Sequence, residues 1–181
     1  RDYTRLLAKL GYAAYCFDFC GGSIPGKGKS DGKNCEMSVL TEVQDMEAVI
    51  AYAKSLPYTG DELLLMGGSQ GGLQTVWAAA LDQDVTKASP QIIWCCDIGK
   101  RGKGRMRSTF EPGYTDALRY FDCVNMARRI TCAVEVPRAG LGDYVSPPSG
   151  IAVFANNLTK KKKKKVSWVQ GSRHGYVPPK K

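Results

Sequence analysis

The sequence predicts an α/β protein in which helices cover both faces of a mostly parallel β-sheet. Short apolar runs bounded by turn residues, typical of buried strands, alternate with longer segments whose apolar residues recur at helical spacing. The chain has 181 residues, of which 43% are hydrophobic, so it can bury a sizeable core. Neither an internal repeat nor a shift in composition divides the chain. We therefore expect a single domain over residues 1–181.

The first elements follow from apolar spacing and turn residues. Residues 2–10 are predicted to be helical. The run "GYAAYCFDF" at 11–19 is largely apolar and is predicted to be a buried strand. Residues 20–38 are rich in Gly, Ser, Lys and Asp, which predicts a long loop. From Val39 to Leu56 apolar residues recur at helical spacing, and Pro57 ends that helix.

The same alternation continues to the end of the chain. Strands are expected at 62–67, 90–96, 133–136 and 166–171, and helices at 70–81, 114–129 and 147–158. In a parallel sheet the carboxyl ends of the strands lie along one edge, where active groups gather. Polar residues that directly follow a predicted strand are therefore the candidates for function.

The net charge of +9 comes mainly from the lysine run 160–165, since +9 − 6 leaves only +3. A run of this kind is typical of a solvated loop or helix end. No aromatic residues alternate with the lysines, as a single-strand nucleic-acid platform requires. No apolar run reaches the roughly 18 residues that span a membrane. We therefore expect neither a nucleic-acid nor a membrane partner, and the sequence does not indicate an oligomeric state.

The chain has seven cysteines and one histidine, and these counts limit the metal sites and redox reactions that are possible. An odd number of cysteines cannot pair completely, and several lie in apolar runs such as "AAYCFDF" and "IIWCC". No Cys-x-x-Cys pair is present, so a metal site is not expected. The cysteine pattern favours a reducing compartment, and we expect the protein in the cytoplasm. The opening "RDYTRLLAKLGY" has no signal-peptide pattern and is typical of the middle of a domain.

One glycine-rich stretch, "GGSIPGKGKS" at 21–30, is similar to a phosphate-binding loop. That motif requires a glycine five residues before Gly28, and the chain has Ser23 there. The following "DGKNCE" is typical of a turn, so no helix amino terminus would face a phosphate. We therefore expect a loop and not a nucleotide site.

A second glycine-rich stretch, "MGGSQGG", places Ser69 between a predicted strand and a predicted helix. The spacing Gly67-x-Ser69-x-Gly71 suits a sharp turn, because glycine removes Cβ atoms that would clash. Such a turn exposes the serine hydroxyl above the sheet. The amide of Gln70 is then expected to point to the same space and to donate to an oxyanion.

A serine needs a base to become a nucleophile, and the base in turn needs an acid. The single histidine, His174, follows the last predicted strand. Asp143 follows the fourth strand, and Asp97 follows "IIWCC" as a competing acid. The order Ser69, Asp143, His174 is the order of residues in α/β-hydrolases, which favours Asp143.

Two further acids lie between these candidates in the sequence. Asp116 and Asp122 fall on the predicted helix 114–129 and are expected to be helix-surface or capping residues.

From about Leu63 onward the chain resembles the acetyl xylan esterase and cephalosporin-C deacetylase branch of the α/β-hydrolases. The matching stretches are "GGSQGG", "CCDIG", "RYFDCVNMARRI", "GLGDYVSPPS" and "GSRHGYVPP". The resemblance implies a serine esterase that removes acetyl groups from sugars without a metal or other cofactor. It assigns Ser69, Asp143 and His174 as nucleophile, acid and base. Gly68, Tyr144 and Pro147 are expected to contact the substrate.

The first 60 residues resemble general serine esterases of the same fold, including cinnamoyl and feruloyl esterases. The family's early strands precede the helix that opens this chain, so the resemblance implies a fold lacking its first strands and the loop that supplies a second oxyanion donor. Pro137 and Arg138 also interrupt the strand that leads to Asp143, since proline cannot donate to a central ladder.

Three hypotheses follow. The first is an active esterase acting on a small acyl ester of a carbohydrate. The second is a catalytically weak or inactive hydrolase scaffold. The third is a basic nucleotide or nucleic-acid binder that uses residues 21–30, "GKRGKGRMR" at 99–107 and the lysine run.

Overall fold

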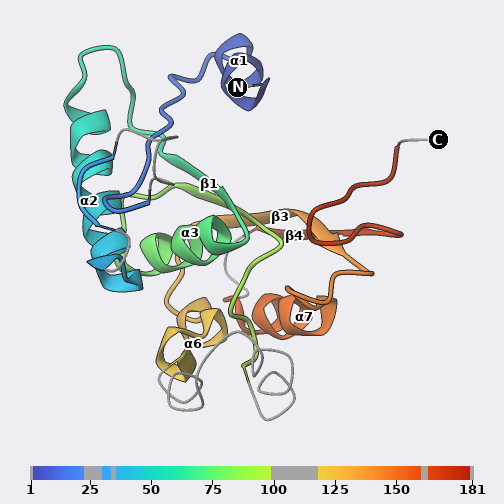
Figure 1. Ribbon diagram of the computed structural model, residues 1–181. Helices are drawn as coiled ribbons and strands as arrows, with labels where there is room; N and C mark the ends of the chain where they lie inside the picture. Colours follow the sequence, from blue (N-terminus) through green and yellow to red (C-terminus); the bar gives the residue numbers. More distant parts are fainter. Residues whose placement is uncertain (1, 23–29, 34–35, 99–117, 160–162, 180–181) are drawn as a thin grey trace. The chain divides into compact units, whose positions relative to one another are not determined.

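The computed structural model describes residues 2–22, 30–33, 36–98, 118–159 and 163–179 (Figure 1). The chain forms two compact units, Arg1–Asp61 and Glu62–Lys181, and each is described by itself. The expectation of a single domain stays a prediction. The candidate phosphate loop 21–30, the stretch 99–107, Asp116 and the lysine run fall wholly or partly outside the described residues.

Two α-helices lie in the described part of the first unit, where the sequence predicts them. Helix α1 spans Asp2–Lys9 and α2 spans Val39–Ser55. Helix α2 begins at a capping box, in which Ser38 Oγ accepts from the Thr41 N–H and Thr41 Oγ1 accepts from the Ser38 N–H. These bonds satisfy two of the amide donors that a helix start leaves without partners.

The strand predicted at 11–19 is wrong. Residues 12–19 have no strand pairing, and most of their side chains are exposed. An apolar run favours a strand only where a neighbouring strand accepts its backbone hydrogen bonds, and in the described part of the chain no strand pairs with it.

The second unit is built on a parallel four-stranded sheet with the order β1-β2-β3-β4 (Figure 1). The strands span Leu64–Gly68 (β1), Lys87–Gln91 (β2), Ala133–Gly140 (β3) and Lys164–Val169 (β4). The parallel α/β architecture predicted from the sequence is confirmed. Because all four strands are parallel, their carboxyl ends lie along the same edge of the sheet.

Helices pack on this sheet and carry much of its core. Helix α3 (Gln70–Leu81) packs on β1 and β2, α7 (Pro148–Asn157) packs on β3 and β4, and α6 (Cys123–Ala127) contacts both helices (Figure 1). Leu73 and Val76 of α3 and Ile151 and Phe154 of α7 are fully buried. The three helices therefore form one layer.

The strand predicted at 90–96 lies too late in the chain, because β2 ends at Gln91. The following "IIWCC" is apolar because it is buried, with Ile93 wholly inaccessible. Its backbone turns sharply, with positive φ angles at Ile92 (38°), Cys95 (62°) and Asp97 (57°). Burial alone does not distinguish a strand from a packed turn.

The helix predicted at 114–129 is also wrong as one element. In its described part, a 3₁₀ helix (η2, Leu118–Phe121) is followed by the short α6. Asp122 separates the two and caps α6 by accepting from the Val124 N–H. The capping role expected for Asp122 is confirmed, and its extended backbone explains why the helix is broken there.

Pro137 and Arg138 do not end the strand that leads to Asp143. Strand β3 continues through them, with a register shift between Val136 and Ala139. The expected interruption is therefore a bulge within a continuous strand.

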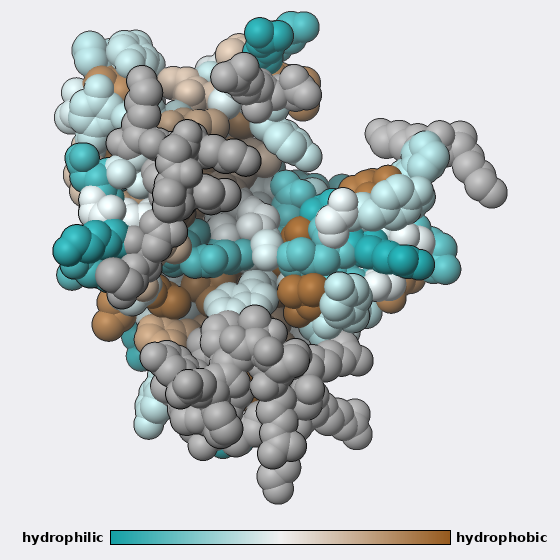
Figure 2. All heavy atoms as spheres, viewed as in Figure 1, coloured by the Kyte–Doolittle hydropathy of each residue, from teal (hydrophilic) through white to brown (hydrophobic). Residues whose placement is uncertain are grey.

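The described residues were compared with what a membrane-spanning helix and an apolar surface patch require. No helix among the described residues is long and apolar enough to cross a membrane. On the face drawn in Figure 2, described hydrophobic residues are interspersed with hydrophilic ones.

Candidate active site

Ser69 lies in the turn between β1 and α3, at the carboxyl edge of the sheet. Its backbone has φ 58° and ψ −116°, a conformation that side-chain-bearing residues rarely adopt. The Ser69 N–H donates to the Gln91 carbonyl at 3.0 Å, and the Ser69 carbonyl accepts from the Trp94 N–H at 3.1 Å. The segment 91–94 therefore holds the strained serine from both sides.

The glycines around Ser69 do not share one role. A Cβ at Gly67 would overlap the carbonyl of Gly71 and lie 2.7 Å from Thr75 Oγ1, so close packing of β1 against α3 requires glycine there. At Gly72 a Cβ would lie 2.8 Å from the Gln91 carbonyl oxygen. At Gly71 the nearest atom would be Gln74 Oε1 at 3.8 Å, so the expectation that Gly71 avoids a clash is wrong.

His174 lies in a turn that follows β4. Its Nε2 is 2.7 Å from Ser69 Oγ, although the two residues are 105 positions apart. The turn is closed by reciprocal backbone bonds, in which the Arg173 N–H donates to the Tyr176 carbonyl at 2.9 Å and the Tyr176 N–H donates to the Arg173 carbonyl at 3.2 Å. The imidazole is 24% exposed, so a small molecule can approach the pair.

Asp143 follows β3, and its side chain is completely buried. Its Oδ1 accepts from the N–H groups of Val145 and Ser146, both at 2.9 Å. His174 Nδ1 lies 3.0 Å from Oδ2 and 3.2 Å from Oδ1. The two backbone donors fix the orientation of the carboxylate toward His174.

These contacts determine which histidine tautomer the site favours. An ionised carboxylate only accepts hydrogen bonds, so the proton of neutral His174 belongs on Nδ1, facing Asp143. The lone pair of Nε2 then faces Ser69 Oγ. The arrangement allows the imidazole to accept the serine proton while the carboxylate stabilises the resulting cation.

The competing acid, Asp97, is not brought into this row. Its side chain is exposed, and its N–H donates to Asp122 Oδ1 at 2.9 Å. Asp122 also accepts from the Ile98 N–H at 2.6 Å, so its buried carboxylate fixes the 97–98 backbone as well as the start of α6.

The other predicted site residues lie next to Ser69 or Asp143 in the sequence. Gln70 is the first residue of α3 and Gly68 the last of β1, and both are exposed. Tyr144 is 69% exposed in the turn after Asp143, and Pro147 is the N-cap of α7. Their roles as oxyanion donor and substrate contacts stay predictions.

Two residues near Ser69, Ser146 and Ile92, are not indicated by any pattern in the sequence. Ser146 is buried, and its Oγ donates to the Ile92 carbonyl at 2.8 Å, while the Ile92 N–H donates to the Arg138 carbonyl at 3.0 Å. These bonds join the Asp143 loop and β3 to the turn that holds Ser69. Because both act on backbone carbonyls, no residue-type pattern reveals them.

The buried cysteines near this turn are unsuited to nucleophilic chemistry. Burial raises the pKa of the Cys95 thiol far above its usual value, and the nearby carboxylate of Asp122 raises it further. Burial likewise raises the pKa of Cys123, whose neighbours include Cys96. Within the described ranges, no group of three His, Cys, Asp or Glu residues is placed to hold a metal ion.

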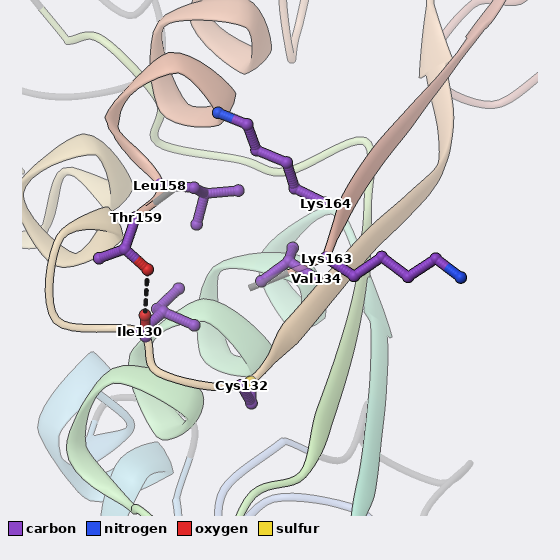
Figure 3. Close-up of a pocket in the computed structure, with 7 residues that line it drawn as sticks. All are labelled: Ile130, Cys132, Val134, Leu158, Thr159, Lys163 and Lys164. Atoms are coloured by element: carbon purple, nitrogen blue, oxygen red, sulfur yellow. Dashed lines mark hydrogen bonds between the residues drawn. The ribbon is translucent and has the colours of Figure 1, made fainter. Parts of the chain in front are cut away.

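A pocket at the other end of the sheet is separate from these residues. It is lined by Ile130 and Cys132, which precede β3, and by Thr159 and Lys163, which precede β4 (Figure 3). Its position at the amino ends of the strands places it away from Ser69, which follows the carboxyl end of β1.

The chain is similar in sequence to known acetyl esterases. Residues 103–180 match the acetyl xylan esterase (AXE1) family model. Over 123 residues the chain is 34% identical to the acetyl esterase Axe7A of Xylanibacter ruminicola (strain ATCC 19189), which covers 62% of this chain and 28% of that protein.

Solved structures show the same fold. Acetyl xylan esterase 1 from Thermoanaerobacterium sp. JW/SL YS485 superposes with a TM-score of 0.60 at 25% identity, covering 73% of this chain and 46% of that one. Est1E from Butyrivibrio proteoclasticus, solved with ferulic acid, superposes with a TM-score of 0.67 at 22% identity, covering 88% and 68%.

The chain therefore has the α/β-hydrolase fold, and its carboxyl-terminal part is similar to acetyl xylan esterases. It spans less than half the length of the two acetyl esterases compared above.

Proposed function

We propose that the chain is a serine esterase that removes acetyl groups from carbohydrate esters. The observation that carries the proposal is the continuous row from Ser69 Oγ to His174 Nε2 at 2.7 Å and from His174 Nδ1 to Asp143 Oδ2 at 3.0 Å. A buried carboxylate, an oriented imidazole and a serine on a strained turn suit acyl transfer. The similarity to acetyl esterases supports the choice of reaction and of substrate.

In the proposed reaction, Ser69 Oγ attacks the ester carbonyl carbon while its proton passes to His174 Nε2. The N–H of Gln70 donates to the oxyanion of the tetrahedral intermediate. The intermediate collapses, and the alcohol leaves with the proton from His174, so that acetate is bound to Ser69 as an ester. Water then attacks the carbonyl carbon of this ester while its proton passes to His174 Nε2, and His174 returns that proton to Ser69 Oγ as acetate leaves.

Hydrolysis of p-nitrophenyl acetate tests the reaction. The variants Ser69→Ala and His174→Ala are expected to lose roughly 10³-fold or more in kcat, because each removes an essential step. Ser55→Ala is the matched control, since Ser55 is exposed and its Oγ donates to the Tyr52 carbonyl within the same helix turn. Equal rates in the wild type and in Ser69→Ala would reject the esterase proposal.

The substrate class needs a second measurement. Acetate release from acetylated xylo-oligosaccharides is expected to exceed ferulate release from methyl ferulate at equal ester concentration. Faster ferulate release would instead place the specificity with feruloyl esterases, which the first 60 residues resemble. A folded protein that hydrolyses neither ester would support the inactive-scaffold hypothesis.

A further inference from the structure

Strand β3 contains one more residue than its partner β4 in the stretch before Asp143. Val136 pairs with Val166 and Ala139 pairs with Trp168, so β3 advances three residues while β4 advances two. The extra residue lies at Pro137–Arg138, where proline has no N–H to donate. A bulge of this kind changes the direction in which a side chain points.

Arg138 in this bulge contacts both loops on which the row depends. Its carbonyl accepts from the Ile92 N–H at 3.0 Å, next to the segment that holds Ser69. Its Nη2 lies 3.5 Å from the backbone carbonyl of His174, to which it donates. One partly buried residue therefore connects the turn beside the serine to the turn that carries the histidine.

The guanidinium of Arg138 is incompletely satisfied. Its Nε is buried and has no hydrogen-bond partner among the described residues. Among the described residues, no carboxylate forms an ion pair with Arg138. A buried charged donor without its full set of acceptors is unfavourable for folding alone and calls for an explanation, of which a functional role is one.

The remaining bonds of the histidine turn explain what Arg138 adds. The Arg173–Tyr176 pair and the bond from Ser172 Oγ to the Tyr176 carbonyl (3.0 Å) close the turn on itself. The Gly142 N–H ties the turn to the Asp143 loop through the Ser172 carbonyl at 3.0 Å. Arg138 is the residue of β3 that bonds to the backbone of His174 itself.

We propose that Arg138 is a positioning residue that holds the backbone of His174 so that its imidazole stays aligned with Ser69. This role rests on the proposed esterase function and assigns a further residue to the same site. The bulge at Pro137 directs the guanidinium toward the backbone carbonyl of His174. Arg138 acts through His174 and does not touch the reacting atoms.

Two variants and one control test this role. Arg138→Met keeps a long side chain but removes every side-chain hydrogen-bond donor. Arg138→Lys keeps a positive charge and one side-chain donor group. Arg128→Met is the matched control, because Arg128 is exposed and its Nε donates to Asn157 Oδ1, away from the row. All are compared as the full chain after thermal unfolding has shown that they fold.

The expected kinetic result is a split between kcat and KM. Arg138→Met lowers kcat for p-nitrophenyl acetate about tenfold or more, since a misplaced base slows proton transfer, and it leaves KM within about twofold. Arg138→Lys restores part of kcat, and Arg128→Met retains it. Wild-type kcat in a folded Arg138→Met protein would overturn the proposal, whereas Ser69→Ala would still test the esterase function separately.

A spectroscopic readout does not depend on activity. The chain has one histidine, so the imidazole resonances of tag-free, ¹⁵N-labelled protein belong to His174 without assignment. Arg138→Met is expected to shift or broaden the Nδ1 and Nε2 signals, and Arg128→Met is expected to leave them unchanged. Identical imidazole signals in the wild type and in Arg138→Met would refute the positioning role even if the protein hydrolysed no ester.

Discussion

The hydroxyl of Ser146 donates a 2.8 Å hydrogen bond to the carbonyl of Ile92, which lies 54 positions earlier in the chain. The N–H of the same serine donates to Asp143 Oδ1. Ile92 has a φ of 38° and follows Gln91, whose carbonyl accepts from Ser69. Ser146 thus ties the carboxylate loop to the strained turn that holds the serine.

The bond from Ser146 predicts that Ser146→Ala destabilises the fold by about 1–2 kcal/mol, because the buried Ile92 carbonyl loses its donor. We also expect a small loss in kcat, because the loop that carries Asp143 separates from the turn that holds Ser69. Urea unfolding and ester hydrolysis measure the two effects. The exposed Ser55→Ala is the control and is expected to change stability by less than about 0.5 kcal/mol. Equal losses in the two variants would argue against the tie.

The glycines beside Ser69 predict opposite effects of the same substitution. Gly67→Ala is expected to cost roughly 3 kcal/mol or more, because its Cβ would overlap the Gly71 carbonyl. Gly71→Ala is expected to stabilise α3 by about 0.5–1 kcal/mol, since its Cβ meets no atom closer than 3.8 Å and alanine favours helix. Thermal unfolding of the two variants compares them. A stable Gly67→Ala protein would contradict the steric explanation.

The two candidate acids predict different kinetics. Asp143→Asn is expected to lower kcat by roughly 10²–10⁴-fold, because an amide does not select the His174 tautomer that leaves Nε2 free to accept. Asp97→Asn is expected to keep kcat within about threefold, since its exposed side chain is outside the row. Ester hydrolysis by both variants decides between the acids, and a greater loss in Asp97→Asn would make Asp97 the acid.

Glu135 predicts a pH-dependent contribution to stability. Partial burial opposes its charged form, but hydrogen bonds to Lys165 and Lys87 outweigh this effect and hold the pKa of Glu135 below its ordinary value of 4.5. Because the pKa is lower in the folded state, the stabilisation is present above pH 4.5 and is lost as the pH falls through the folded-state pKa. Glu135→Gln is therefore expected to destabilise the protein at pH 7.

The magnitude and salt dependence of this effect provide its check. Solvent screens a pair this exposed, so Glu135→Gln is expected to cost less than about 1 kcal/mol at pH 7 and progressively less as the pH falls below 4.5. Unfolding free energies across this range, in low and high salt, measure the difference. A difference independent of pH would contradict an electrostatic origin.

Local patterns were sufficient to predict much of the fold. The helix expected at 70–81 matches α3, because "GGSQGG" marks the turn before it. The helix expected from Val39 begins at the capping serine that precedes it. These elements depend on residues near in the sequence, which is why spacing and capping reveal them.

Elements that depend on distant partners were not predictable from local patterns. The run "IIWCC" is apolar because it is buried, yet its turn at Ile92 accepts a bond from the distant Ser146, and the backbone just after the run donates to the distant Asp122. Residues 11–19 have the composition of a strand but no pairing in the described part of the chain. A single residue, Asp122, divides a segment with helical periodicity.

The candidate site shows the same division. Ser69, Asp143 and His174 were indicated by motif and by position after predicted strands, and the structure places their side chains in hydrogen-bond contact. For Arg138 the sequence predicts only an interruption of the strand that leads to Asp143. Its contact with the His174 carbonyl depends on the bulge, and no residue type or spacing reveals a register shift.

Covalent labelling tests the central claim that His174 activates Ser69 as a nucleophile. The full chain is treated with a fluorophosphonate, and the modified residue is located by mass spectrometry of peptides. The account predicts one adduct on Ser69 that forms roughly 10³-fold more slowly in His174→Ala. A well-folded chain that carries no adduct on Ser69, or that labels equally fast without the imidazole, would contradict it.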